Sequence, residues 1–138
     1  MKAAIFLASG FEEIEAITVI DVLRRAGIEV TIVSTAGSKT VKGAHGIKIE
    51  TEIAFDFLDK EVFDAVILPG GMPGTLNLKR DDAVKSMVGD YLTKGKLVGA
   101  ICAAPMVLGE LGMLAGREAT CYPGYEKHLK NAILKTDD

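Results

Sequence analysis

The chain has 138 residues, of which 49% are hydrophobic, enough for one domain with a full core. Its formal net charge is −3 and both signs are scattered along the chain, so neither nucleic acid nor a membrane is expected as a partner. The two cysteines form no disulfide or metal-binding spacing motif, and no apolar run approaches the roughly 20 residues of a membrane span. These features predict a cytoplasmic protein with reduced thiols and no metal site.

Short apolar runs alternate with helical patterns along the chain. The first run shows no polar alternation, as expected of a parallel strand covered on both faces. The predicted strands are Ala3–Leu7, Glu29–Ser34, Phe63–Leu68, Leu97–Ile101 and Glu118–Tyr122. The predicted helices are about Glu12–Ala26, Asp81–Lys94, Ala104 to near Gly112, and Tyr125–Ala132. The remaining predicted elements are a small hairpin over Gly37–Glu50 and an irregular or short helical connection over Phe55–Leu58.

This alternation predicts a single α/β domain over residues 1–138. The expected architecture is a doubly wound, mostly parallel sheet with helices on both faces and a small hairpin insertion. Ligands of such sheets bind beyond the carboxyl ends of the strands. The four prolines fall just past the ends of predicted strands and both cysteines lie at strand ends, so the loops at that edge are the place to look for chemistry.

The stretch Leu97–Pro105 has the pattern of a strand–turn–helix elbow. Cys102 follows the apolar strand, and the residues two positions to either side, Ala100 and Ala104, are small enough for a sharp bend. Pro105 suits the first turn of the next helix. A thiol at the amino end of a helix is favoured as the thiolate. The alternative is an inert core cysteine, since cysteine is among the most buried residue types.

Glu15 falls on the apolar stripe of the first predicted helix. The other members of this stripe are expected to face the sheet and are Ala16, Val19, Ile20, Val22, Leu23 and Ala26. A carboxylate there is costly unless it is paired, hydrogen-bonded or protonated, which makes Glu15 a functional candidate. The alternative is a capping acid, because the helix dipole favours carboxylates in the first turn. On the opposite face, Ile14 and Ile17 lie among charged residues and indicate a partner surface.

Gly70 and Gly71 follow the third predicted strand. No Gly-Lys-Ser/Thr comes after them, and no dinucleotide fingerprint follows the first strand, so no nucleotide site is expected. The backbone N–H groups of these glycines and of Ala103, after the cysteine, are candidate donors to an oxyanion. The alternative is a turn that needs glycine for its geometry alone.

Three motifs in this order resemble the ThiJ/PfpI superfamily, and in particular its DJ-1 branch. They are Ala8–Glu15 (ASGFEEIE), Leu68–Gly71 (LPGG) and Ala100–Pro105 (AICAAP). The resemblance implies a flavodoxin-like sandwich and a homodimer whose contact includes the first helix. Members of the branch are glutathione-independent glyoxalases, proposed deglycases, oxidation sensors and chaperones, and other members of the superfamily are cysteine peptidases.

The same resemblance implies roles for individual residues. Cys102 matches the reactive cysteine and Glu15 the glutamate that hydrogen-bonds it. Gly71 and Ala103 match the amide donors.

The sequence departs from the superfamily pattern at two places. Tyr122 stands where a histidine beside the nucleophile is frequent, and the only histidines are His45, in the hairpin, and His128. His45 is expected to be an exposed turn residue, with a neighbouring subunit's site as the alternative. The chain also stops at Asp137-Asp138, where the family continues with a hairpin-like segment and a helix. A domain without that segment is expected to have one sheet face or the site edge uncovered.

Two main hypotheses follow. The first is a cofactor-independent enzyme for small reactive carbonyls, in which Cys102 attacks an aldehyde and Glu15 moves a proton between its carbons. The second is an oxidation-sensing stress protein or chaperone that uses the same cysteine, with Cys121 as a resolving thiol or a core residue. A peptidase or a glutaminase-type subunit is disfavoured, because nothing in the sequence places a histidine beside Cys102.

Overall fold

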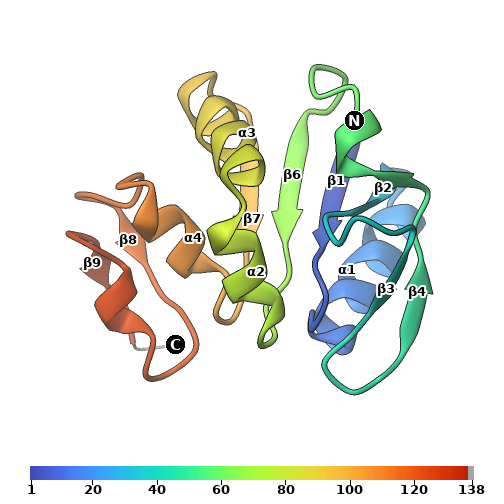
Figure 1. Cartoon of the computed structure of the whole chain (residues 1–138). Helices are drawn as coiled ribbons and strands as arrows, with labels where there is room; N and C mark the ends of the chain where they lie inside the picture. The colour runs from blue at the N-terminus through green and yellow to red at the C-terminus, as the bar shows by residue number, and fades with distance from the viewer. Residues whose placement is uncertain (137–138) are drawn as a thin grey trace.

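The computed structural model describes residues 1–136 and is built on a five-stranded parallel sheet (Figure 1). In spatial order the strands are β5 (Ile53–Ala54), β2 (Glu29–Ser34), β1 (Lys2–Leu7), β6 (Ala65–Leu68) and β7 (Leu97–Ala100). β1 pairs in parallel with both β2 and β6, so the strand order reverses at β1. The four longer strands follow the flavodoxin-like order 2-1-3-4, and the two-residue β5 is added at the edge beside β2. The predicted fold class is confirmed.

Helices cover both faces of the sheet. One face carries α1 (Glu13–Arg25) and the hairpin of β3 (Thr40–Lys42) and β4 (Lys48–Glu50). The other face carries α2 (Gly74–Arg80), α3 (Asp82–Thr93) and α4 (Pro105–Glu110) (Figure 1). The layers are therefore the ones that the alternation of strands and helices predicts.

The packing of β1 explains its unbroken apolar sequence. Ala3 and Ile5 belong to the core under α1, whereas Ala4 and Phe6 belong to the core under α3 and α4, and each is at most 1% exposed. A strand buried on both faces has no position at which a polar side chain reaches water.

The last third of the chain differs from the prediction. The strand expected over Glu118–Tyr122 is only β8 (Glu118–Ala119), and it pairs with β9 (Ile133–Leu134) outside the main sheet. The helix expected over Tyr125–Ala132 is a single 3-10 turn, η2 (Glu126–His128). Asn131 adopts φ +60°, and a right-handed helix cannot continue through that conformation.

Some shorter elements were also misplaced or missed. α2 and β5 were not predicted, because two to seven residues carry too little periodicity to detect. The 3-10 turn η1 (Phe55–Phe57) lies within the predicted connection. Val22 and Ala26 were expected to face the sheet but are exposed, because α1 lies on the sheet along a narrower stripe.

The edge strand β7 is less buried than predicted. Leu97 is 59% exposed, and an apolar opening of about 320 Å³ lies between β7, β6 and α1, lined in part by Leu23, Ile67 and Val98. One face of this edge therefore has no helix over it in residues 1–136. Asp137-Asp138, where the resemblance predicts a missing segment, lies outside the described residues. Within residues 1–136, no helix has the length and apolar content needed to span a membrane.

Candidate active site at Cys102

Cys102 occupies the turn between β7 and α4. Its φ is +61°, a left-handed conformation that residues other than glycine adopt rarely and at a cost. Ala103 and Ala104 are buried, and Pro105 is the first residue of α4. The backbone thus forms the predicted strand–turn–helix elbow, and Cys102 at its bend belongs to neither β7 nor α4.

Glu15 reaches Cys102 from the first turn of α1 across the glycine loop. Its Oε2 accepts the backbone N–H of Gly70 at 2.8 Å, and its carboxylate is hydrogen-bonded to the Cys102 thiol. A Cβ added to Gly70 would lie 2.6 Å from Glu15 Oε2 and 2.6 Å from Cys102 Cβ. Only glycine leaves room for the two side chains to meet at this point.

The glycine loop is tied to the start of α1 by the backbone. The Glu12 N–H donates to the Gly70 carbonyl at 2.9 Å, and Gly71 has φ +92°. A side chain at Gly71 would collide with the backbone of Glu12, so the close approach of loop and helix requires glycine here. This contact fixes the distance between Glu15 on α1 and Cys102 on the elbow.

Burial and Glu15 control the protonation of the thiol. Burial, the largest cause, raises the pKa of Cys102 above its ordinary value, and the hydrogen bond to Glu15 and its negative charge raise it further. The backbone N–H groups of Ala103 and Gly71 lower the pKa, but not enough to offset these causes. The predicted bias toward thiolate is therefore outweighed, and the resting group at neutral pH is a thiol hydrogen-bonded to Glu15.

The thiol opens into a small cavity at the carboxyl edge of the sheet. The cavity has a volume of about 220 Å³ and is lined by Glu12, Gly71, Met72, Cys102, Ala103, Tyr122 and Tyr125. The rings of Tyr122 and Tyr125 meet edge to face at 6.3 Å, and the Tyr122 N–H donates to the Cys102 carbonyl at 2.8 Å. The space suits a molecule of a few heavy atoms.

The structure brings most of the predicted site residues together. Glu15, Gly70, Gly71 and Ala103 surround Cys102, and Tyr122 lines the cavity. His45 does not line it, and within residues 1–136 no histidine does. Cys121 lines a different cavity, and both cysteines are free.

Several residues near the site were missed. Met72 and Tyr125 line the cavity, and no motif or spacing in the sequence indicated a role for either residue. Glu13 is only 5% exposed, and no feature of the sequence distinguished it from the other acids of the first turn of α1. His45 Nδ1 lies 2.9 Å from Glu13 Oε2 and 3.5 Å from Glu12 Oε1. The sequence of a single segment cannot predict the contact between His45 and these glutamates, because it joins the hairpin to the start of α1.

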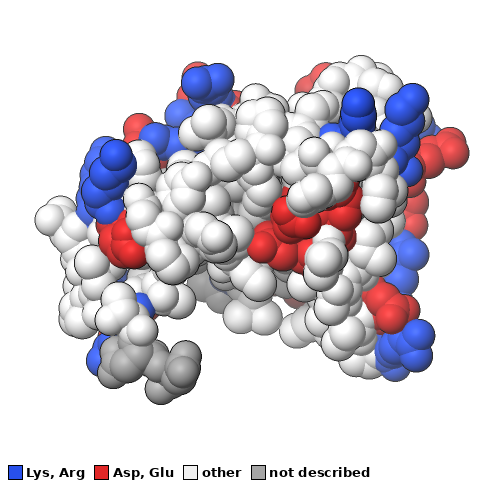
Figure 2. Space-filling model, turned by 90° about the horizontal axis from the view of Figure 1, so that it is seen from below, with Lys and Arg blue, Asp and Glu red and all other residues white. Residues whose placement is uncertain are grey.

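Acidic groups dominate the surroundings of the cavity. Seen from the side onto which the carboxyl ends of the strands open, Asp and Glu side chains gather beside the central hollow, and Lys and Arg lie mainly at the periphery (Figure 2). Glu12 lines the cavity itself, and no lysine or arginine does. Such a site favours neutral or cationic molecules over anionic ones.

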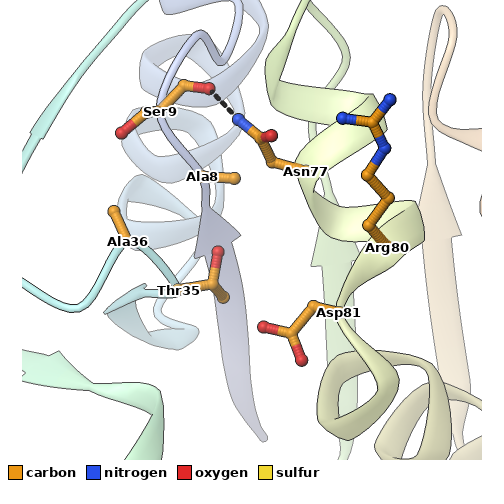
Figure 3. A pocket seen from close by; sticks show the side chains of 7 residues that line it. All are labelled: Ala8, Ser9, Thr35, Ala36, Asn77, Arg80 and Asp81. Atoms are coloured by element: carbon orange, nitrogen blue, oxygen red, sulfur yellow. Dashed lines mark hydrogen bonds between the residues drawn. The ribbon is translucent and has the colours of Figure 1, made fainter.

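A larger opening of about 350 Å³ lies between the end of β1, the loop after β2 and α2 (Figure 3). Its lining residues are Ala8, Ser9, Thr35, Ala36, Asn77, Arg80 and Asp81. The Asn77 amide donates to the Ser9 carbonyl at 2.8 Å, and the Asp81 carboxylate caps α3. With no thiol, histidine or free carboxylate in its lining, this opening lacks the chemistry of the smaller Cys102 cavity.

Comparison with known proteins places the chain in a family. It matches the DJ-1/PfpI family over residues 1–138. It is 41% identical over 129 residues to the DJ-1 homolog B of Arabidopsis thaliana, which covers 93% of this chain but only 30% of the plant protein. It is also 34% identical over 138 residues to a protein of Pyrococcus horikoshii named a deglycase, covering 100% of this chain and 82% of that protein.

Solved structures agree with the sequence match. The structure of oxidized Toxoplasma gondii DJ-1 has 34% sequence identity and superimposes with a TM-score of 0.86, covering 92% of this chain and 70% of the other. Fold and sequence therefore point to the same family.

Proposed function

Because the chain belongs to the DJ-1/PfpI family, we propose that it is a cytoplasmic, cofactor-independent cysteine enzyme acting on small reactive carbonyls, of the glyoxalase or deglycase type. One observation carries the proposal: the Glu15 carboxylate and the N–H groups of Gly71 and Ala103 converge on the Cys102 thiol in a cavity of about 220 Å³. The relative named a deglycase supports the same class of substrate.

The arrangement suits a reaction that begins from a neutral thiol. As Cys102 Sγ attacks the aldehyde carbon of methylglyoxal, the thiol proton passes to Glu15 and a carbon–sulfur bond forms. The N–H groups of Gly71 and Ala103 stabilise the resulting oxyanion, which then takes the proton back from Glu15 as a hemithioacetal.

Glu15 can then complete the isomerisation. Its carboxylate removes the hydrogen of the carbon bonded to sulfur as a proton, giving an enediolate, and returns the proton to the neighbouring carbon. The proton of the hydroxyl group on the first carbon passes to the oxygen of the second, so that the first carbon becomes a thioester carbonyl and the second carries the hydroxyl group. The product is the lactate thioester of Cys102. Water hydrolyses this thioester to lactate and restores the thiol, so the net reaction adds one water to methylglyoxal and needs no cofactor.

The direct test measures lactate formed from methylglyoxal, and free arginine released from a methylglyoxal–arginine adduct. Cys102→Ser is expected to abolish both activities, while Cys121→Ser, which changes the other cysteine in a separate cavity, is expected to leave them unchanged. Undiminished turnover by Cys102→Ser would overturn the proposal. Activity on methylglyoxal alone would indicate a glyoxalase, and activity on the arginine adduct alone would indicate a deglycase.

A second candidate function is oxidation sensing, alone or with chaperone activity, because a similar protein, the DJ-1 of Toxoplasma gondii, was solved in an oxidized form. Two molecules of peroxide would convert the Cys102 thiol to a sulfinic acid with release of two waters. Mass spectrometry after mild peroxide treatment tests this function. Selective addition of two oxygens to Cys102 supports it, whereas equal oxidation of Cys102 and Cys121 counts against it.

We also propose that the protein is a homodimer through α1. Ile14 and Ile17 are 75% and 42% exposed on the outer face of this helix, where an isolated chain has no use for apolar side chains. A second copy of the same helix would cover them.

A further inference from the structure

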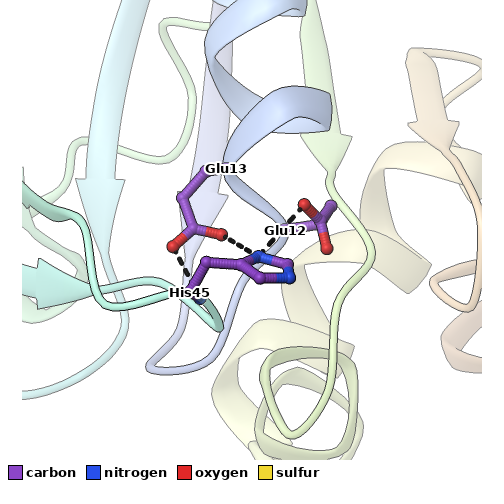
Figure 4. A group of neighbouring side chains, drawn as sticks. All are labelled: Glu12, Glu13 and His45. Carbon is purple, nitrogen blue, oxygen red and sulfur yellow. Dashed lines mark hydrogen bonds and ion pairs between the residues drawn. The ribbon is translucent and has the colours of Figure 1, made fainter.

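A second group of reactive side chains lies beside the Cys102 cavity and contains no cysteine. Glu12 and Glu13 at the start of α1, and His45 in the β3–β4 loop, each bring one ligand atom within 4.8 Å of the others (Figure 4). We propose that these three residues bind a divalent transition-metal ion, with zinc as the ion that best suits them. The inference is independent of the proposed carbonyl chemistry.

The distances fit a single ion. Ligand atoms bound at about 2.0–2.2 Å to one tetrahedral zinc lie about 3.3 Å from one another. His45 Nδ1 lies 2.9 Å from Glu13 Oε2 and 3.5 Å from Glu12 Oε1, on either side of that value. Both carboxylates point at the same ring nitrogen (Figure 4). The ligand atoms of Glu12 and Glu13 also lie within 4.8 Å of each other, so adjustment of the exposed His45 and half-buried Glu12 side chains would complete the coordination.

Glu13 is held in place for such a role by the hairpin. Its Oε1 accepts the backbone N–H groups of His45 at 2.8 Å and Ile47 at 3.3 Å, which leaves Oε2 directed at the imidazole. A Cβ on Gly43 would collide with the Glu13 carboxylate, so glycine at this position makes the buried pocket for it. Hydrogen bonds that orient a ligand in this way are typical of metal sites.

No lysine or arginine in the described part of the chain balances the charge of the two carboxylates. Within residues 1–136, neither Glu12 nor Glu13 forms an ion pair with a lysine or arginine, and only His45 faces them. The Nδ1 proton is the one positive partner available, and a divalent ion in its place would neutralise both carboxylates. Metal and proton therefore compete for the same position.

The ligand types define the class of metal. One imidazole nitrogen and two carboxylate oxygens suit zinc, cobalt or nickel, whereas calcium and magnesium prefer oxygen ligands alone. His45 is exposed on its outer side, so water can fill the remaining positions. The sequence predicted no metal because no spacing motif is present, and the ligands here are 32 residues apart in the chain.

The test is a titration with Co²⁺, which reports its ligands by visible absorption. Wild type is expected to give the weak bands of nitrogen and oxygen coordination, without the intense charge-transfer band of a thiolate ligand, and Zn²⁺ is expected to displace the cobalt. Removing an outer hydrogen-bond partner of a ligand already costs about 10–100-fold in affinity, so His45→Ala should weaken binding by at least about tenfold. His128→Ala, which changes the only other histidine, should not alter it.

The design separates loss of a ligand from loss of the fold. His45→Ala keeps the backbone N–H groups that hold Glu13, and circular dichroism checks that the variant is folded. Glu12→Gln provides a second variant and should also weaken binding. Equal Co²⁺ affinity in wild type and both variants, a thiolate charge-transfer band, or no saturable binding at millimolar Co²⁺ would each overturn the proposal.

Discussion

Glu15 and Cys102 meet over the backbone of Gly70. A Cβ at Gly70 would lie 2.6 Å from Glu15 Oε2 and 3.1 Å from Cys102 Sγ, so the hydrogen bond between carboxylate and thiol exists only because no side chain stands between them. The two residues are brought from α1 and the β7–α4 elbow, 87 positions apart in the chain, and the glycine loop after β6 is what joins them.

This relationship predicts the effect of Gly70→Ala. The added methyl group should push the Glu15 carboxylate and the thiol apart, and a misplacement of about 1 Å costs about 10²-fold in turnover. Methylglyoxal assays measure this loss. The matched control is Gly99→Ala in β7, where a Cβ would be 3.8 Å from its nearest neighbour, Ile67 Cγ1, an ordinary contact. Equal activity of Gly70→Ala and Gly99→Ala would show that the contact over Gly70 has no role in turnover.

Glu15→Gln should separate the reactivity of the thiol from catalysis. The hydrogen bond and the negative charge of Glu15 both raise the pKa of Cys102, so removing the charge should lower that pKa and speed alkylation by iodoacetamide at neutral pH. Turnover should nevertheless fall by about 10²–10⁴-fold, because the group that moves the proton is lost. The pH dependence of alkylation, measured beside the assay, tests both parts.

Glu29→Gln serves as the control for that experiment. Glu29 pairs with Lys2 at the opposite end of the sheet, so this change should affect neither alkylation nor turnover. Slower alkylation in Glu15→Gln than in Glu29→Gln would contradict the assigned effect of Glu15 on the thiol.

Much of this arrangement was predictable, because its main residues lie at positions that can be recognised in the sequence, such as the end of a strand or the apolar face of a helix. Cys102 follows a strand and precedes Pro105, and Glu15 lies on an apolar stripe, so each was named from sequence and the structure places them in contact. The burial of Glu13 was not predictable. It results from the hairpin folding over the start of α1, and neither segment has a sequence pattern that predicts this long-range contact.

The failure over Tyr125–Ala132 has a similar cause. This segment has a helical composition, but its backbone packs so closely on α4 that a Cβ on Gly109 would collide with the His128 carbonyl. Leu129 is 3% exposed and joins the core, while Asn131 turns the chain with φ +60°. Tertiary contact overrides local propensity here, whereas the long strands are specified by their continuous apolar runs and α1 by its apolar periodicity.

The Glu13–His45 pair predicts a stability that depends on pH. The hydrogen bond that His45 donates to Glu13, and the charges of Glu12 and Glu13, raise the pKa of His45. Burial works to raise the pKa of Glu13, but the hydrogen bonds from His45 and the backbone hold it below its ordinary value of 4.5. The pair should therefore stabilise the fold fully between pH 4.5 and 6.5, the ordinary values of the two groups.

The stabilisation from this pair should decrease both above and below this pH range. As pH rises through the raised pKa of His45, the imidazole loses its proton and the stabilisation is lost; as pH falls through the lowered pKa of Glu13, the carboxylate is protonated and it is lost again. With a chelator present, His45→Ala should have a lower Tm than wild type near pH 5.5 and nearly the same Tm near pH 9. An equal difference at both pH values would mean that the pair does not titrate with folding.

The outer face of α1 predicts the oligomeric state. Exposed apolar side chains at Ile14 and Ile17 flank the acidic start of the helix, and a charge at both positions should prevent a second copy from packing there. Light scattering after gel filtration should find wild type as a dimer and Ile14→Lys/Ile17→Lys as a monomer that keeps its circular dichroism spectrum. The control is Phe57→Lys in η1, away from α1, at a position that is 80% exposed. Glu15 lies between the two isoleucines in sequence, and its side chain accepts the Gly70 N–H from the other side of the same helical turn. A dimer contact at Ile14 and Ile17 would therefore also restrain the turn of α1 that carries Glu15. Turnover measured across a dilution series should then fall as the wild-type dimer dissociates, and a monomeric wild type would remove the basis for both expectations.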